Sequence, residues 1–340
     1  MKLSKLMAAA TVGLVSLALA ACGGSGAGGG GKTEFKLAFN QTEEHPQYAA
    51  GVEFGKRLEQ ATGGRYSIRV YPNEQLGGQA DVIQNLSDGT VEMMWVGGPV
   101  LESYNKDFAV FNLPYVFDSV EAQGAILSDT GLLGGLYASI EDSKRITVLA
   151  GVHAGVRNVY NSKHAIRTPE DLKGLKIRVQ QSDSQVKMIE SMGAVASPMG
   201  QGDVYSALQG GVLDGAENNE TVFNALKHDE VAKYYSYTKH LMIPDYMLIS
   251  TKALQGMSKE DREAFLALIP DIQDMADEGF VKFAEESKAK SEAAGAQFNE
   301  DADTAAFKAL VQPLVETSVG ENDLRKKLYE AIQQANDENK

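Results

Sequence analysis

The sequence contains a single cysteine, Cys22, among its 340 residues. One cysteine excludes an internal disulfide, a CxxC redox pair and a multi-cysteine zinc site. The five histidines never form an HExxH pattern, so a zincin-type metalloprotease is excluded too. A GxSxG nucleophile elbow is also absent. No metal site is expected from these residues, and no cofactor.

The sequence is also poor in basic residues, with 32 Lys and Arg against 46 Asp and Glu, a net charge of −14. Such a surface repels nucleic acid and anionic lipid headgroups, so neither is an expected partner. Hydrophobic residues make up 43% of the chain and charged residues 23%. These proportions are typical of a soluble globular protein with a sizeable core in one or two domains.

The N-terminus has the features of an export signal. Lys2 and Lys5 precede an apolar stretch over residues 6–21, which is short for a membrane-spanning helix. The stretch ends in Leu-Ala-Ala-Cys, which resembles a bacterial lipobox. Residues 1–21 are therefore predicted to be a lipoprotein signal peptide, with lipid attached to Cys22; the alternative is an ordinary signal beside an incidental thiol. The protein is then exported and held on the outer side of the cytoplasmic membrane or in the periplasm, with the lipid anchor as its only membrane attachment.

Residues 22–32 are predicted to be a glycine-rich tether. Gly26 to Thr33 spells the phosphate-loop pattern G-x-x-x-x-G-K-[ST]. That loop needs a strand before it and a helix after it, because the helix N-terminus supplies the amides. This string lies between the lipobox and a strand-like run, so nucleotide binding is not expected.

The body of the chain alternates strand and helix patterns. Strands are expected at 35–39, 66–71 and 91–96, with helices starting near Pro46 and covering about 77–88. This order predicts a parallel, doubly wound sheet. The second half repeats it, with strands expected at 146–150, 157–160, 175–179 and 246–250 and helices at about 183–193 and 202–209. A local pattern, L-x-x-G-x-[VL]-[ED], occurs at both 86–92 and 208–214.

The prediction is an α/β protein with two lobes like those of a periplasmic binding protein. The first lobe comprises residues 33–150 and 245–300, the second residues 151–244, and helices in 301–340 pack on both. A helical region after Ser258 is expected to break at Pro270. Trp95 is more simply a core residue than a stacking platform. Such lobes bind ligand in the cleft at the carboxyl ends of their strands, where Arg178 and the run 217–220 fall.

Five motifs make a more specific identification. Residues 168–179 (TPEDLKGLKIRV), 71–77 (YPNEQLG), 112–117 (NLPYVF), 155–157 (GVR) and 213–218 (LDGAEN) resemble the DctP-type solute-binding proteins. These proteins serve tripartite ATP-independent periplasmic (TRAP) transporters, and the likeness spans roughly residues 33–330. The resemblance implies a non-enzymatic protein that captures a small organic acid and delivers it to TRAP membrane permease subunits. The duplicated α/β pattern and the chain crossings near Ala150 and Pro244 predict that the two lobes close on the ligand.

The resemblance also implies roles for individual residues. Arg178 would clamp the ligand carboxylate, because a planar guanidinium makes two parallel charge-assisted hydrogen bonds. Arg157 would lie near that carboxylate, unless it forms a structural ion pair. Asn218 would donate to the ligand, unless it only forms a turn. Gln181 and Gln201 would line the pocket.

Three further candidates come from their positions in the chain. Glu74 could accept hydrogen bonds from ligand hydroxyls, or be a solvated loop acid. His45 precedes a helix at the cleft mouth and could cap that helix instead of touching ligand. Asn219 adds another group able to bind hydroxyls.

One arginine clamp with several groups that bind hydroxyls suits a polyhydroxylated monoacid better than a dicarboxylate. Residues 45–48, 105–111 and 198–202 look like the sugar-acid branch of the family, so a hexuronate such as glucuronate or galacturonate is predicted. A C4-dicarboxylate or an aldonate is the alternative ligand. Three other classes remain: a surface-tethered enzyme that processes sugar acids, the binding protein of an ATP-driven importer, and the ligand-binding partner of a sensor.

Overall fold

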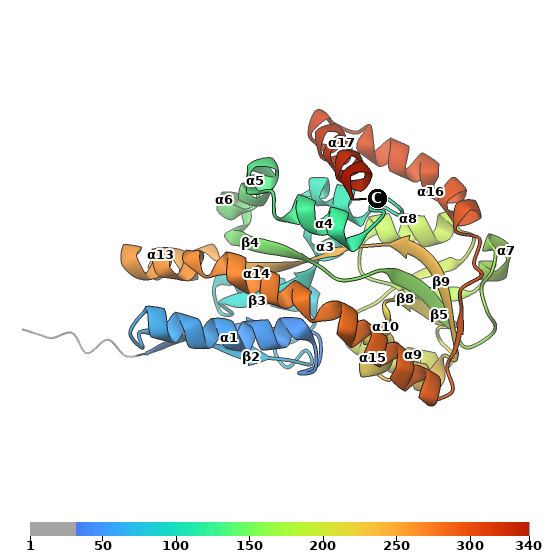
Figure 1. Cartoon of the computed structure of the whole chain (residues 1–340), viewed down its shortest axis with the longest axis horizontal. Helices are drawn as coiled ribbons and strands as arrows, with labels where there is room; N and C mark the ends of the chain where they lie inside the picture. Colours follow the sequence, from blue (N-terminus) through green and yellow to red (C-terminus); the bar gives the residue numbers. More distant parts are fainter. Residues whose placement is uncertain (1–31, 340) are drawn as a thin grey trace, which may run out of the picture. The chain divides into compact units, whose positions relative to one another are not determined.

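The computed structural model describes residues 32–339, a mixed α/β protein with two sheets (Figure 1). The predicted signal peptide, Cys22 and all of the tether except Lys32 lie outside these residues. Within the described part, no helix is both long enough and apolar enough to cross a bilayer.

The first sheet has the strand order β2-β1-β3-β10-β4. β1 pairs in parallel with β2 and β3, as the alternation of strands and helices predicts, whereas β10 runs antiparallel to β3 and β4. The sheet is therefore mixed. Its strands are β1 (Thr33–Ala38), β2 (Tyr66–Tyr71), β3 (Met93–Gly97), β4 (Ile146–His153) and β10 (Pro244–Ser250).

The helices around this sheet begin and end where local chemistry dictates. α1 starts at Pro46, which has no N–H to leave unsatisfied, and α2 ends at Gly89, whose φ of 74° favours glycine. The helices are α1 (Pro46–Ala61), α2 (Gln79–Asp88), α3 (Gly98–Leu101), η1 (Lys106–Asn112), α4 (Val120–Leu127), α5 (Thr130–Ala138), α6 (Glu141–Lys144), α12 (Thr251–Gly256), α13 (Lys259–Ala267) and α14 (Ile269–Glu278).

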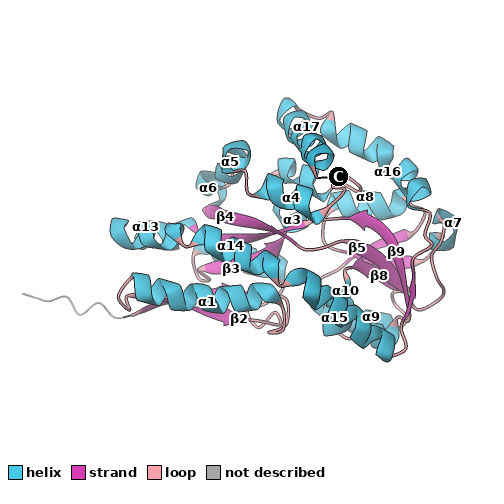
Figure 2. Ribbon diagram, in the orientation of Figure 1, coloured by secondary structure: helices cyan, strands magenta, loops and turns pink. Residues whose placement is uncertain are grey.

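The second sheet has the order β11-β9-β5-β8-β6-β7 and is also mixed. Figure 2 labels three of its strands, β5, β8 and β9. β6 is parallel to β7 and β8, while β5 is antiparallel to β8 and β9. Its strands are β5 (Arg157–Asn161), β6 (Lys176–Val179), β7 (Val195–Pro198), β8 (Gly215–Asn218), β9 (Tyr234–Leu241) and β11 (Gln297–Asn299).

Helices of the second half and the C-terminus complete the protein. α16 packs against β9 and α8, and α17 packs against α4 and η1, so the last two helices touch elements from both halves of the protein. The helices are α7 (Pro169–Leu172), α8 (Asp183–Ser191), η2 (Gln201–Asp203), α9 (Val204–Gln209), α10 (Glu220–Ala225), α11 (His228–Val231), α15 (Phe280–Ala293), α16 (Thr304–Val319) and α17 (Asp323–Glu338).

The two sheets define two lobes, which we name by their residues. The first lobe is 33–153 with 244–278, and the second is 157–241 with 280–299. Residues up to 300 were expected in the first lobe, but β11 pairs with β9, so residues 297–299 join the second sheet. α15 packs against α10 of the second lobe, while α14 packs against α1 of the first.

The chain passes between the lobes through short segments at 154–156, at 242–243 and at Gly279, counted over residues 32–339. At the first of these, Gly155 has a φ of +70°, and a Cβ on it would lie 2.4 Å from the Phe280 ring. A larger residue at position 155 would therefore meet the ring of Phe280, the first residue of α15, which follows the third passage.

The core explains the remaining sequence patterns. Trp95 is buried in the first lobe, as expected of a core residue. Phe265, Ile269 and Ile272 are buried in the same lobe. The helical region breaks at Leu268, and Pro270 is the second residue of α14, close to the predicted position of the break.

Candidate ligand-binding site

Arg178 is a buried cation on β6 whose charge has no partner. Only 3% of the residue is exposed, and its Nε and Nη2 donate to the carbonyl oxygen of Met199 at 2.9 and 2.7 Å. Within the described residues it forms no ion pair. Burial lowers the pKa of Arg178 to about 10, against the opposing attraction of Glu217. A buried charge without a counterion is costly, so the site favours an anion from outside the chain.

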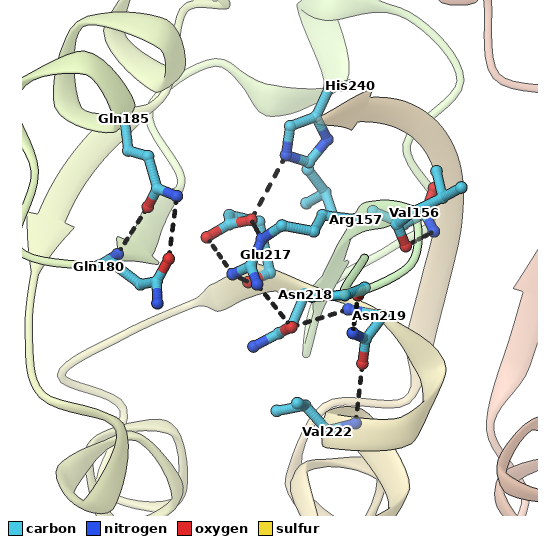
Figure 3. A network of polar contacts seen from close by, with 12 residues as sticks. Val156, Arg157, Gln180, Gln185, Glu217, Asn218, Asn219, Val222 and His240 are labelled. Carbon is cyan, nitrogen blue, oxygen red and sulfur yellow. Dashed lines mark hydrogen bonds and ion pairs between the residues drawn. The ribbon is translucent and has the colours of Figure 1, made fainter. Parts of the chain in front are cut away.

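Arg157 on β5 is paired in a different way (Figure 3). Its Nε and Nη2 donate to the two carboxylate oxygens of Glu217 at 2.6 and 2.7 Å, and Glu217 is fully buried. Burial by itself raises the pKa of Glu217, but the Arg157 guanidinium outweighs it and lowers that pKa to about 2. His240 Nε2 lies 3.6 Å from the same carboxylate. The ion pair is thus complete without a ligand.

The Arg157–Glu217 pair orients Asn218 at the end of β8. Asn218 Oδ1 accepts from Arg157 Nη1 at 2.8 Å and from the Asn219 backbone N–H at 2.9 Å. Because two donors hold the oxygen, the Nδ2 group must point the other way, as Figure 3 shows. Asn218 is therefore presented as a hydrogen-bond donor.

Asn219 is engaged within the protein. Its Oδ1 accepts from the Val222 N–H at 3.0 Å and caps α10, and its Nδ2 donates to the carbonyl of Ala154 at 2.7 Å. It ties β8 to the passage between the lobes.

Gln180 is a site residue that the sequence analysis did not single out. Gln185 Oε1 accepts from the Gln180 N–H at 2.9 Å, and Gln185 Nε2 donates to Gln180 Oε1 at 3.1 Å, which leaves Gln180 Nε2 free to donate (Figure 3). The predicted neighbour, Gln181, is exposed. Side chains alternate along an extended chain, so Arg178 and Gln180, two positions apart at the end of β6, share a face. Gln181 follows where the chain turns, with the Ser182 N–H donating to the Gln180 carbonyl oxygen at 2.8 Å. That alternation was the available signal.

Glu74 of the first lobe contacts the second lobe, and Gln201 of the second lobe contacts the first. The Gly202 N–H donates to the half-buried Glu74 carboxylate, whose pKa is raised by burial. Gln201 Oε1 accepts from Asn40 Nδ2 at 3.2 Å, and its Nε2 lies 3.3 Å from Asn40 O and from Gln41 Oε1. The loops that follow β1 and β2 thus touch η2 across the cleft.

His45 caps α1 and is packed in an aromatic cluster. Its Nδ1 accepts from the Gln47 N–H at 3.2 Å, and its ring has edge contacts with Phe39, Phe280 and Phe283. Burial, then the nearby His153, lowers the pKa of His45 to about 3, so it is neutral at physiological pH.

These side chains line two adjoining spaces between the lobes. The cleft pocket, about 360 Å³, is lined by Arg178, Glu74, Gln180, Gln181 and Gln201. The inner cavity, about 20 Å³, has room for about one water molecule and is lined by Arg157, Asn218, Asn219 and His45. Gln79, Gln180 and Gln201 border both spaces. The cleft pocket lies within the range of known small-molecule sites, roughly 300–1,000 Å³.

A larger cavity of about 740 Å³ lies near the passages between the lobes, against Phe117, Met242 and Phe280. Its lining is mostly apolar, two of its lysines are exposed, and Lys288 is paired with Glu300. It offers no buried unpaired charge, so the cleft pocket is the better candidate. Among residues 32–339, no cluster of three or more His, Cys, Asp or Glu could hold a metal ion.

Known proteins resemble this chain over nearly its full length. A solute-binding protein from Chromohalobacter salexigens is 34% identical over 295 residues, which cover 86% of each chain. A TRAP periplasmic solute-binding protein from Anaerococcus prevotii, crystallised with bound D-glucuronate, is 36% identical with a TM-score of 0.87, over 90% of this chain and 99% of that one. Another from Sulfitobacter sp., with bound β-D-galacturonate, is 31% identical with a TM-score of 0.83, over 89% and 100%.

The family match covers the same region. Residues 37–322 match the family described as bacterial extracellular solute-binding protein, family 7, or DctP. This range contains the second sheet, the first sheet except the first four residues of β1, and the whole of the cleft pocket. It confirms the family that the five sequence motifs indicated. The chain therefore belongs to the DctP family of TRAP transporter solute-binding proteins.

Proposed function

We propose that this protein binds a hexuronate, D-glucuronate or D-galacturonate, in the cleft pocket and delivers it to a TRAP permease. The observation that carries the proposal is Arg178, a buried guanidinium without a carboxylate partner among the described residues, in a pocket of about 360 Å³. A ligand carboxylate on its Nη1 side completes the charge pairing. The A. prevotii and Sulfitobacter structures, with their bound uronates, support this choice.

The charge count favours a monoacid over a dicarboxylate. Arg157 already has a carboxylate, Glu217, so one unpaired buried cation remains in the described cleft. The other polar groups that line the two spaces are amides, His45 and four carboxylates, and all of these can bind sugar hydroxyls. The carboxylates are those of Glu74, Asp81, Asp203 and Asp245. A second ligand carboxylate would meet Glu74 or neutral amides, and would be desolvated without a cation.

Calorimetric titration against a small set of acids tests this proposal. D-Glucuronate and D-galacturonate should bind, D-gluconate and succinate should bind at least tenfold more weakly, and D-glucose, which lacks the carboxylate, should show no binding. Tight binding of succinate with none of the uronates would overturn the monoacid assignment.

We also propose that the protein is exported as a lipoprotein anchored through Cys22 and that it does not chemically alter its ligand. The lipobox-like sequence and the absence of a nucleophile elbow motivate these two points. Cys22→Ser should move the protein from the membrane fraction to the soluble fraction. Uronate incubated with purified protein should be recovered unchanged; its conversion would instead establish the enzyme alternative.

A further inference from the structure

Glu102, which follows α3 in the first lobe, makes a partly buried contact with the second lobe. Its Oε1 accepts from Ser184 Oγ at 2.6 Å, and its Oε2 accepts from Ser182 Oγ at 3.0 Å. On its own lobe, Asn112 Nδ2 donates to Oε1 at 2.9 Å. Both serines are at the start of α8, and Ser182 is its N-cap. A carboxylate beside a helix N-terminus is favoured by the exposed N–H groups there.

The turn that Glu102 holds is the one that carries Gln180. Gln185, in the first turn of α8, fixes the Gln180 amide through two hydrogen bonds. The same turn separates two spaces, because Gln181 lines the cleft pocket on one side and a cavity of about 480 Å³ on the other, where Glu102 and Ser182 also lie. Without the Glu102 contacts, the turn at residues 180–182, which separates the cleft pocket from this second cavity, would lose its attachment to the first lobe.

We infer that Glu102, Ser182 and Ser184 form a clasp that closes the lobes over the ligand and positions Gln180. This inference extends the proposed function. Its test by release of uronate rests on that proposed function. The clasp residues bind no ligand themselves; they act by holding the closed arrangement, so they set the rate at which ligand leaves. The cluster needs both lobes, since Asn112 alone supplies a single donor to a carboxylate that has two oxygens.

Burial makes this contact worth more than a surface hydrogen bond. Glu102 is partly buried, and that burial raises its pKa while the serine and asparagine donors oppose the rise. A buried carboxylate that loses a donor suffers the desolvation cost without compensation. Separation of the lobes would return this carboxylate to water, so the clasp favours closure only while its donors are in place.

Two variants with a matched control test the clasp. Ser184→Ala removes the shorter contact and leaves the Ser182 cap of α8 intact, whereas Ser191→Ala on the same helix removes a hydroxyl that bonds only to the Lys187 carbonyl. Stopped-flow release of D-glucuronate should be roughly tenfold faster for Ser184→Ala and Glu102→Ala, with association changed less than threefold. Glu102→Gln, which keeps an acceptor, should fall between them and wild type. Ser191→Ala should match wild type.

A second measurement needs no ligand. Spin labels on exposed positions of the two lobes, at Lys56→Cys and Lys187→Cys in a Cys22→Ser background, report the distance between α1 and α8. The clasp predicts a longer or broader distance distribution in Ser184→Ala and Glu102→Ala than in wild type. A merely structural role would lower the melting temperature without this shift.

The release rates and the ligand-free distances together distinguish failure of the clasp from failure of the proposed function. If wild type binds no uronate, the proposed function fails, while the ligand-free distances still decide on the clasp. Distances and release rates in Ser184→Ala and Glu102→Ala that equal those of wild type would overturn the clasp, whatever the ligand.

Discussion

Two buried arginines flank β8 in the second lobe, and the protein satisfies them in opposite ways. Arg157 on β5 has a bidentate carboxylate partner in Glu217, whereas Arg178 on β6 has a backbone carbonyl. Both residues are 3% exposed, so burial does not distinguish them. The difference lies in the counterion. An arginine paired inside the protein holds the site together, and one left unpaired is available to a ligand.

From this difference we expect Arg157 to contribute mainly to the stability of the folded protein and Arg178 mainly to the affinity for ligand. The Arg157 pair sets the orientation of Asn218 and links β5 to β8, so it acts on ligand through another residue. Arg178 lines the cleft pocket directly. Substitutions at the two positions should therefore change different measured quantities, and the following predictions run from the largest expected effect to the smallest.

Arg157→Ala should cost the most. Removing one partner of a buried ion pair leaves the other charge uncompensated, which typically destabilises by about 3–5 kcal/mol. Here the orphan would be Glu217, which is fully buried. Urea unfolding should show the loss in the free energy of unfolding. A loss below about 1 kcal/mol would mean that water or His240 replaces the guanidinium.

The pH dependence of stability tests the same Arg157–Glu217 ion pair. The folded-state pKa of Glu217 is lowered to about 2 from an ordinary value of 4.5. Its contribution to stability is therefore fully present above pH 4.5 and is lost as the pH falls toward 2. Glu217→Gln should be less stable at neutral pH and should lack this part of the acid dependence.

Arg178→Ala should abolish tight binding and leave the fold intact. Truncating one partner of a buried charge pair costs about 2–5 kcal/mol of binding free energy, which is roughly 30-fold to several thousand-fold in Kd. Arg178→Lys should fail almost as badly, because a point charge cannot form the bidentate contact. Titration with the best uronate measures both. Arg178→Ala binding within threefold of wild type would refute the carboxylate clamp.

Arg178→Met should stabilise the ligand-free protein. Burial lowers the pKa of Arg178, which means that the folded state disfavours its charge at neutral pH. Methionine keeps much of the volume without that charge, and a gain on the order of 1 kcal/mol is typical when a strained functional group is removed. Urea unfolding without ligand should show a higher free energy of unfolding than wild type, the opposite sign to Arg157→Ala.

The sequence predicts some elements well and others poorly, for physical reasons. β1 and β2 follow from alternating apolar residues, because one face of each strand packs on the core. The pattern does not predict β9, because its buried face carries Ser236, Thr238 and His240. These polar residues are tolerated inside only because backbone N–H groups of Ile166 and Val159 donate to Ser236 and Thr238, partners that the fold alone brings near.

The residues of the candidate site also fall into those that the sequence motifs single out and those that only the fold brings together. Motifs single out Arg178, one residue before the end of the predicted strand 175–179, and Asn218, the last residue of the LDGAEN motif. They do not identify Glu217 as the partner of Arg157, because the two residues are 60 positions apart and meet only through the pairing of β5 with β8. Asn219 and His45 have the residue types of ligand-binding groups, but their hydrogen bonds are used to cap α10 and α1.

The smallest expected effect concerns Gln180 and Gln181. The structure predicts that Gln180 contacts the ligand, whereas the sequence motifs predicted that Gln181 does. Gln180 is 6% exposed and is oriented by Gln185 toward the space it shares with Asn218, while Gln181 is exposed at the rim of the cleft pocket. Removing a neutral hydrogen bond to ligand typically costs about 0.5–1.5 kcal/mol. Gln180→Ala should therefore raise Kd by roughly 2- to 13-fold, and Gln181→Ala should stay within twofold of wild type. Titration of the pair under one set of conditions cancels errors in protein concentration and ligand purity. A larger effect at Gln181 than at Gln180 would show that the ligand approaches from the rim, and that the strand alternation linking Arg178 to Gln180 does not define the binding face.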